Sequence, residues 1–241
     1  MPRIYISQIA RLRTSARRGM LRQLWHYVSR GPLTRNFTIR RFLSQSGFKC
    51  LQIGGGRHVV RQWINGDLIF GDIYLNAQKR LPFPDDSLDA VFTEQFFEHL
   101  PLADGRHLLC EIFRVLKPGG ILRQSTPDLA GLIAIYLDTN EFTSREEAVR
   151  RHIINHCKGQ GYNLENACQF LNDFNHLWGH QFLYDRQSLE RLNLEAGFTE
   201  LEWRNFGESP HSELRNRERH ADLTWMEKAF VVIYETRKPQ N

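Results

Sequence analysis

The sequence predicts an α/β protein whose central sheet is mainly parallel and covered by helices on both faces. Short apolar runs that end in glycine or other turn residues alternate with segments of helical periodicity. Parallel strands are joined by crossover connections, usually helices, and these cover both sides of the sheet. With 241 residues, the chain has room for one large domain and appendages.

Seven apolar runs are the candidate strands. The first, residues 48–53, ends in Gly54-Gly55-Gly56, which indicates a buried strand that enters a tight turn. The other six are Trp63–Ile69, Ile73–Leu75, Leu88–Thr93, Gly120–Ser125, Thr199–Asn205 and Ala229–Thr236.

The segments between these runs predict helices. From Leu102 to Leu116 apolar residues recur on one face, and residues 117–120 (Lys-Pro-Gly-Gly) end that helix because proline cannot continue its hydrogen-bond ladder. A second helix is expected from Arg186 to Ala196. Residues 129–184 are rich in His, Asn and aromatic residues and show no clear strand. We interpret them as a helical insertion that covers the carboxyl edge of the sheet.

A basic arm, residues 1–46, precedes the domain at 47–241. From Ile9 to Val28 apolar residues recur at three- and four-residue steps, which predicts an amphipathic helix that ends at Gly31-Pro32, before a short basic stretch. No Asp or Glu occurs before Asp67, whereas thirteen Lys or Arg do. Such an arm could cap the domain with its arginines in solvent, attach to an anionic membrane surface through residues 1–30, contact nucleic acid, or act as a transit peptide.

Composition narrows the class of protein. The chain has no apolar run long enough to span a bilayer, and its start lacks an apolar stretch followed by a small-residue cleavage site. Cys50, Cys110, Cys157 and Cys168 show no CxxC spacing, so no disulfide framework is expected. These features favour a cytoplasmic protein, peripheral on the inner membrane surface if the arm binds lipid.

Four strings give the chain its resemblance to a known family. They are Leu51-Gln52-Ile53-Gly54-Gly55-Gly56, Trp63-Ile64-Asn65-Gly66-Asp67, Leu81-Pro82-Phe83-Pro84-Asp85-Asp86-Ser87-Leu88-Asp89 and Arg114-Val115-Leu116-Lys117-Pro118-Gly119-Gly120. In this order they resemble the class I S-adenosylmethionine-dependent methyltransferases of the methyltransferase type 11 kind, among them predicted bacterial enzymes linked to cell-surface glycan genes. The resemblance implies a Rossmann-like, doubly wound, seven-stranded sheet whose last strand is antiparallel.

The resemblance also implies where the cofactor, S-adenosylmethionine, binds. Glycines let the backbone approach the cofactor, so Gly54, Gly55 and Gly56 would receive its methionine part. Asp67, at the end of the second strand, would accept hydrogen bonds from the ribose hydroxyls, with Asp72 in reserve. Asn65, in the same string, is also expected to bind the cofactor.

Adenine recognition departs from the family's pattern. Relatives often place an acidic residue before the Leu-Pro-Phe string, where this chain has Asn76, whose amide oxygen can still accept from the adenine amine. Ala77 and Gln78 would flank the ring. Gln52 and His58 also depart from the pattern, so the cofactor loop is atypical.

The catalytic candidates follow the fourth strand. Glu94 would lie beside the cofactor, and Glu98-His99 resembles the family's Glu-His string at the carboxyl edge of the sheet. His99 is the candidate general base for a hydroxyl acceptor, with Glu98 orienting or screening it. In the alternative interpretation, the Glu-His pair only holds the start of a helix.

The acceptor would be bound by residues from several segments. Ser125, Thr126 and Asp128 end the fifth strand, although they could instead cap the next helix. His176, His180 and Tyr184 would line a polar pocket, or be packed in ordinary fashion. Arg215, with Arg217 and Arg219, could clamp a phosphate or carboxylate of the acceptor, or lie in a solvated loop. His152 and His156, like His176 and His180, have the four-residue spacing of helical zinc sites, but the HExxH glutamate is missing. We expect no metal.

These observations predict methyl transfer to a small polar acceptor, most plausibly a hydroxyl of a sugar or glycan precursor. Two alternatives stay open. The acceptor could be RNA, drawn in by the basic arm, or the chain could bind the cofactor without catalysis, as the partner of another enzyme.

Overall fold

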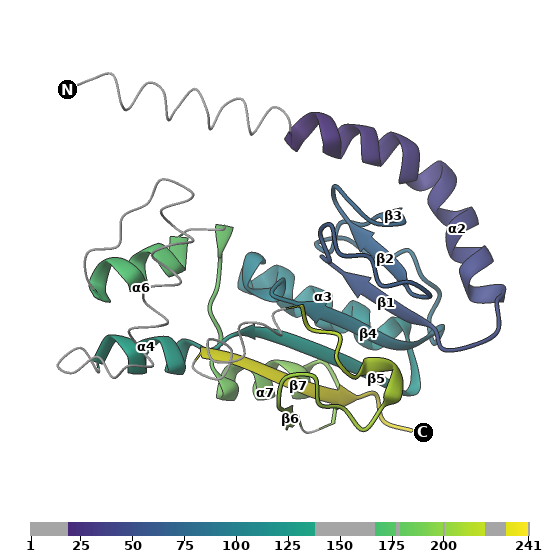
Figure 1. Ribbon diagram of the computed structural model, residues 1–241. Coiled ribbons are helices and arrows are strands. Elements are labelled where there is room, and N and C mark those ends of the chain that lie inside the picture. The colour runs from purple at the N-terminus through teal and green to yellow at the C-terminus, as the bar shows by residue number, and fades with distance from the viewer. Residues whose placement is uncertain (1–18, 138–166, 177–178, 200, 220–229, 241) are drawn as a thin grey trace, which may run out of the picture.

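The computed structural model describes residues 19–137, 167–176, 179–199, 201–219 and 230–240. Its centre is a seven-stranded sheet in the order β3-β2-β1-β4-β5-β7-β6 (Figure 1). The strands are β1 (Cys50–Ile53), β2 (Ile64–Asp67), β3 (Ile73–Tyr74), β4 (Leu88–Glu94), β5 (Leu116–Pro127), β6 (Glu202–Arg204) and β7 (Val231–Arg237). The first five are parallel, and β7 is inserted antiparallel between β5 and β6. The predicted mainly parallel sheet with an antiparallel last strand is confirmed.

The register of the central strands fixes the edge at which a site can form. All four residues of β1 are buried, and Cys50–Ile53 pair with residues 90–93 of β4. Gly54 and Glu94 therefore lie at the same, carboxyl edge of the sheet. In doubly wound sheets, ligands bind along this edge.

The sequence predicts helices on both faces of the sheet, and among the described residues two helices cover one face. α3 (Leu102–Val115) and α7 (Arg186–Glu195) bury Leu108, Ile112, Leu189 and Leu192 in the main core. A second, smaller core cluster includes Cys50, Phe92 and Ile121 of the strands. Among the described residues, loop residues cover this cluster: Trp63, and Leu214 of the short helix η3 (Ser212–Leu214).

β5 is longer than the predicted run, which began at Gly120. α3 ends at Val115, as expected, but the chain enters the sheet at once, at Leu116. The pairing with β4 is irregular between Leu88 and Ala90, which accommodates the Lys-Pro-Gly-Gly turn.

The arm contains more helix than the sequence indicates. Residues 19–30 are helical, and α2 (Pro32–Ser44) follows after a bend at Gly31. The predicted helix ends at Gly31-Pro32, and a second helix begins there because proline is compatible with the first position of a new helix. The carbonyl of Gly31 accepts the first two amide bonds of α2, from Thr34 and Arg35. α2 lies along the β3 side of the sheet (Figure 1).

The predicted insertion is described only at its ends. α4 (Leu129–Leu137) and α6 (Ala167–His176) are helical, and Asp128 bridges to Tyr184. Residues 138–166 lie outside the described part, with His152, His156 and Cys157, as do residues 1–18 of the arm. Cys50, Cys110 and Cys168 are free thiols. None of the helices described is long and apolar enough to cross a membrane.

Candidate active site

The loop after β1 requires glycine and faces open space. Gly54 has a φ of +71°, and a Cβ there would lie 2.0 Å from the ring of Phe96. Gly56 has a φ of +59°, and a Cβ there would meet nothing within 4 Å. A Cβ on Gly55 would lie 2.5 Å from the Gln52 side chain. The loop is thus packed from behind and open at Gly56, as a backbone cradle for a ligand must be.

Asp67 ties the end of β2 to this loop. Its carboxylate accepts hydrogen bonds from the amides of Gly56 (3.1 Å), Ile69 (2.8 Å) and Phe70 (3.2 Å). A carboxylate has about four acceptor positions, so one remains for a ligand. Asp67 is half-buried, and its carboxylate bonds to the amide of Gly56, where the loop is open.

Asn65, the other polar residue of this string, has its side-chain groups bonded within the protein. It is 3% exposed; its Oδ1 accepts from the amide of Val60, and its Nδ2 donates to Asp72 Oδ2 at 2.7 Å. These bonds hold the turn before β2 and the one after it. Cofactor contact by Asn65 stays a prediction.

The residues predicted to bind the adenine of the cofactor follow β3. The Oδ1 atom of Asn76 accepts from the amide of Gln78 at 3.0 Å, and the Gln78 side chain donates to Asp104 Oδ2 at 2.6 Å. Ala77 is buried and Gln78 is exposed. This turn lies beyond the same strand end as Asp67, because β3 runs parallel to β2 and pairs with it at Asp67↔Tyr74.

Glu98, in the short helix η1 (Phe97–His99) after β4, is a buried acid of the site. It is 1% exposed, and its Oε2 accepts from the Thr126 hydroxyl at 3.1 Å. Its Oε1 has no partner among the described residues. Burial raises the pKa of Glu98 to about 8, because no cation offsets the loss of solvent.

Two histidines complete a cluster around Glu98. The rings of His99 and His180 are 5.0 Å apart, and His180 Nδ1 lies 2.7 Å from the carbonyl of Phe174. Burial lowers the pKa of His180 to about 4, so its ring is neutral at pH 7. One potential ligand atom from each of Glu98, His99 and His180 lies within 4.8 Å of the others. The geometry would allow a cation to bind there, so the expectation of no metal stays a prediction.

Tyr184 forms the inner wall of this group. Its ring is fully buried and stacks on Phe97 with centroids 4.8 Å apart. Burial and the neighbouring Glu98 raise the pKa of the Tyr184 hydroxyl, so it keeps its proton. We call Glu98, His99, Thr126, His180 and Tyr184 the acceptor cluster. Ser125, next to Thr126 on β5, is also buried.

Three predicted acceptor residues have other surroundings. Asp128 accepts from the amide of Ala130 at 3.1 Å, the bond of a helix cap on α4. Arg215 donates to the carbonyls of Ser209 (2.7 Å) and Pro210 (3.3 Å). His176 is exposed at the end of α6. The structure shows none of the three in the acceptor cluster.

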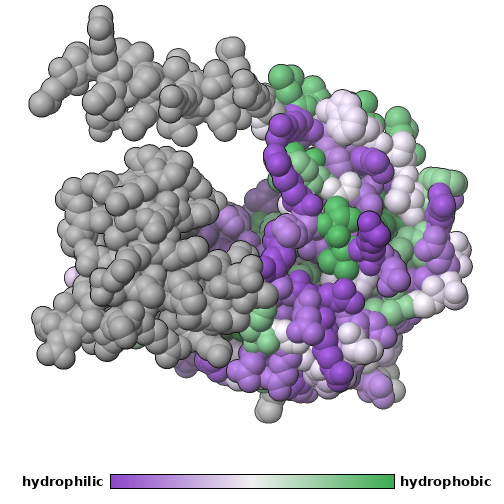
Figure 2. All heavy atoms as spheres, in the orientation of Figure 1, coloured by the Kyte–Doolittle hydropathy of each residue, from purple (hydrophilic) through white to green (hydrophobic). Residues whose placement is uncertain are grey.

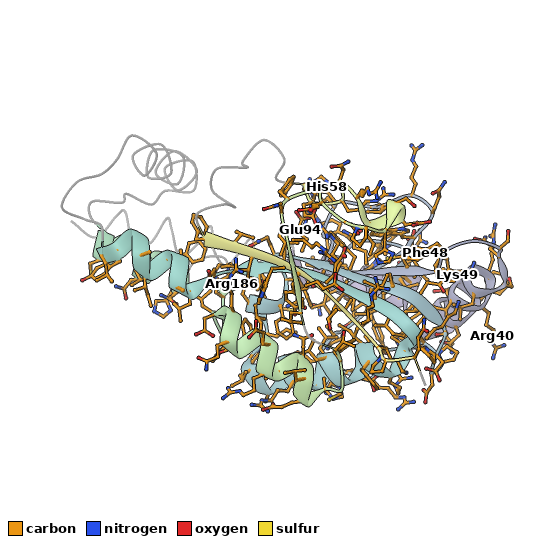
Figure 3. The ribbon with its side chains drawn as sticks, turned by 90° about the horizontal axis from the view of Figure 1, so that it is seen from below. Arg40, Phe48, Lys49, His58, Glu94 and Arg186 are labelled. Carbon is orange, nitrogen blue, oxygen red and sulfur yellow. The ribbon has the colours of Figure 1, made fainter. Side chains whose placement is uncertain are left out.

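Glu94 has a partner that sequence analysis did not assign to it. It is 3% exposed, and it accepts from both the amide and the Nε of Arg219, each at 2.7 Å. Figure 3 shows Glu94 and Lys49 toward opposite ends of the sheet, as the strand direction requires. The two paired residues are 125 positions apart, so no local pattern connects them.

A buried ionic network holds the loop that carries Arg219. Arg123, fully buried on β5, donates through Nε to Glu218 (2.7 Å) and through Nη1 to Glu235 (2.8 Å). Glu218 also accepts from the amide of Gly207 at 3.1 Å. The network joins residues 207–219 to the sheet.

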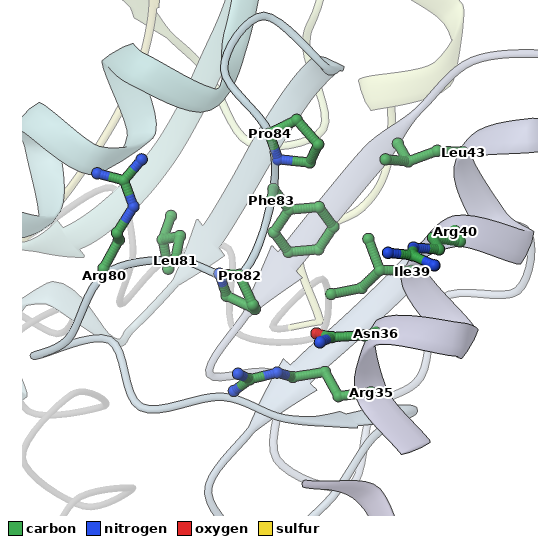
Figure 4. A pocket seen from close by; sticks show the side chains of 10 residues that line it. All are labelled: Arg35, Asn36, Ile39, Arg40, Leu43, Arg80, Leu81, Pro82, Phe83 and Pro84. Carbon is green, nitrogen blue, oxygen red and sulfur yellow. The ribbon is translucent and has the colours of Figure 1, made fainter. Parts of the chain in front are cut away.

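A groove on the β3 side of the molecule lies apart from these residues. It has a volume of about 460 Å³ and is lined by α2 and by the Leu-Pro-Phe-Pro string, with Arg35, Arg40 and Arg80 (Figure 4). None of the residues predicted for cofactor or acceptor lines it.

Comparison with known proteins gives the class. Residues 57–123 match the family model of the methyltransferase domain. These residues therefore match a methyltransferase domain, as the four strings predicted, and the observed strand order is the one that the resemblance implies. A relative from Mycolicibacterium smegmatis, described as a probable S-adenosylmethionine-dependent methyltransferase, is 38% identical over 71 residues.

The sequence matches are partial. The match to the Mycolicibacterium protein covers 30% of this chain and 25% of the relative. A sterol 24-C-methyltransferase from Yarrowia lipolytica is 48% identical over 42 residues, which is 17% of this chain and 10% of that protein. The chain thus spans about a quarter or less of the length of these curated relatives.

Solved structures with a similar outline include two further methyltransferases. One is a putative methyltransferase in complex with the Trm112 activator of Haloferax volcanii (TM-score 0.46, 15% identity, covering 92% of this chain and 94% of that one). The other is from Thermotoga maritima, described as a possible histamine N-methyltransferase (TM-score 0.44, 18% identity, covering 95% and 97%). We draw no functional conclusion from these two.

Proposed function

We propose that this protein transfers a methyl group from S-adenosylmethionine to a hydroxyl of a small polar acceptor, such as a sugar or glycan precursor. The observation that carries the proposal is the continuity between two parts of the site. Phe96 packs behind Gly54 of the cofactor loop, and the chain continues directly into Glu98 and His99 of the acceptor cluster. Cofactor loop and candidate base therefore share one edge of the sheet.

The loop and Asp67 suit the cofactor. The open space at Gly56 admits a ligand to the backbone, and Asp67 retains one acceptor position for a ribose hydroxyl. Asn76 and its neighbours at the end of β3 would take the adenine. When bound, the cofactor supplies the electrophilic methyl group.

The acceptor cluster would remove the proton of the acceptor hydroxyl. His99 is the base in this proposal. The carboxyl group of Glu98 lies close enough to orient the His99 ring. His180 has a pKa of about 4 and does not compete for the proton.

The character of the acceptor follows from the groups around the cluster. Ser125 Oγ, next to Thr126 of the cluster, is buried and has no hydrogen-bond partner among the described residues. Buried polar groups are almost always paired, so hydroxyls of this kind would be satisfied by a polar ligand. A hydroxyl-rich sugar fits this need better than an apolar acceptor.

Calorimetry with S-adenosylhomocysteine tests the cofactor half of the proposal. Asp67→Asn should weaken binding about 10- to 150-fold, because a hydrogen bond to a charged group contributes about 1.5–3 kcal/mol. Asp86→Asn is the matched control, since Asp86 is exposed before β4 and should leave the affinity unchanged. No binding by the wild-type protein at millimolar ligand would refute the cofactor assignment.

Transfer of labelled methyl groups tests the acceptor half. Free sugars, nucleotide sugars and RNA are offered in parallel to the full chain, and we expect product only with sugar-containing acceptors. Product with RNA would favour the RNA-directed alternative. Tight cofactor binding without product on any acceptor would favour a non-catalytic partner protein.

A further inference from the structure

The arm turns its apolar side away from the domain. The exposed large side chains of residues 19–30 are Met20 (67%), Leu21 (66%), Leu24 (59%), Trp25 (68%), Tyr27 (45%) and Val28 (68%). α2 adds Leu33 (94%) and Phe37 (69%). A helix on a globular protein normally points its apolar stripe at the core, so the arrangement here is the reverse.

The side of the arm that meets the domain makes both polar and apolar contacts. His26 is 3% exposed and lies against Tyr74 of β3, with ring centroids 6.3 Å apart. Arg35 donates to the carbonyl of Tyr74 at 3.4 Å. Tyr27 packs edge-on against the ring of Tyr74, with centroids 4.9 Å apart, and Ile39 of α2 is buried in the main core. The arm is therefore fixed to the edge of the sheet through these residues, and the remaining exposed apolar side chains do not serve that contact.

The charge of this surface has one sign. Residues 19–44 contain five arginines and no Asp or Glu. Four of them, Arg22, Arg30, Arg40 and Arg41, are exposed. At helical spacing, Arg40 and Arg41 share the outer side of α2 with Leu33 and Phe37. Figure 2 shows apolar and hydrophilic residues side by side over this part of the molecule.

We propose that the outer face of residues 19–44 docks on an anionic phospholipid bilayer, with the helices lying in the plane of the headgroups. Apolar residues that include a Trp, bordered by arginines, are what an interfacial helix needs, because the rings and aliphatic chains enter the acyl boundary while the guanidinium groups stay at the phosphates. Each arginine near such a surface adds favourable electrostatic energy.

Charge complementarity decides between the possible occupants. In a symmetric dimer the same patch would face itself, which would bring the arginines of both copies together without an acid to pair them. An anionic bilayer matches both the apolar row and the surrounding charge. This inference goes beyond the proposed reaction and does not depend on it.

Vesicle co-sedimentation with the full chain tests the proposal. We expect binding to vesicles of phosphatidylcholine with phosphatidylglycerol, at least tenfold weaker binding to phosphatidylcholine alone, and weaker binding at high salt. The double variant Leu21→Ser/Trp25→Ser should lower the partition onto anionic vesicles at least tenfold. The control Leu137→Ser/Leu194→Ser makes the same change at two exposed leucines outside the arm and should bind as the wild type does.

Folding and oligomeric state are read in parallel. Both double variants should melt as the wild type does, and light scattering should give the same mass for all three proteins. Absence of vesicle binding, equal binding to both lipid compositions, or equal binding by the arm variant would overturn the proposal. A wild-type dimer that dissociates in the arm variant would assign the surface to self-association instead.

Discussion

Replacing Arg123 by methionine should strongly destabilise the domain. Its guanidinium is fully buried between the carboxylates of Glu218 and Glu235, with N to O distances of 2.7 and 2.8 Å. Methionine fills part of the same space but removes the cation that pairs with Glu218, while Glu235 keeps only its longer contact with Arg204 at 3.2 Å. Removing one partner of a buried ion pair costs about 3–5 kcal/mol.

Thermal unfolding followed by circular dichroism measures the loss. For a chain of this length, 1 kcal/mol corresponds to about 2–4 °C, so the Tm should fall by about 6–20 °C. Arg106→Met is the matched control, because Arg106 pairs with Glu195 at 2.6 Å with both side chains about half exposed. Exposed pairs contribute about 0–1 kcal/mol, so this variant should lose less than about 4 °C.

The sign of the pH dependence provides a second check. Burial already raises the pKa of Glu218 above its usual value. Without Arg123, the folded state should hold a proton on Glu218 that the unfolded chain has released at neutral pH. Stability falls with rising pH wherever the folded state binds more protons, so the variant should lose more at about pH 8 than at about pH 5.5. A Tm within about 4 °C of wild type at both pH values would refute the reasoning.

Three further predictions concern the site. Gly54→Ala should lower the affinity for S-adenosylhomocysteine, measured by calorimetry, at least tenfold, because the new Cβ would lie 2.0 Å from a ring carbon of Phe96. The control Gly47→Ala is also at positive φ, but nothing lies within 4 Å of its Cβ, so it should leave the affinity unchanged. His99→Gln should lower kcat about 10²–10⁴-fold with unchanged cofactor affinity, and the same change at the exposed His107 should not; equal rates would exclude His99 as the base. Activity should survive treatment with EDTA, because a neutral Glu98 with a pKa of about 8 is a weak metal ligand, and a loss restored by one added cation would contradict this.

Local patterns were sufficient for most of the fold. The runs at β1 and β4, the glycine loop, and the end of α3 at the Lys-Pro-Gly-Gly string lie where the sequence predicts them, because each depends on neighbours in the chain. The Glu98-His99 string could also be found from its place after β4. The beginning of α2 at Pro32 was missed, since Gly-Pro is compatible both with the end of one helix and with the start of the next.

The sequence alone determined the order of strands and helices, the methyltransferase resemblance and the one-sided charge of the arm, all of which are properties of contiguous residues. The folded structure was needed to show that His180 and Tyr184 join Glu98, and that Arg219 pairs with Glu94. It also shows that Arg123 is buried between two acids and that most of the apolar row of residues 19–30 faces outward. The physical reason is that these contacts join residues distant in sequence, or depend on which face of a helix meets the sheet. Periodicity shows that a stripe exists, but packing decides which way it points.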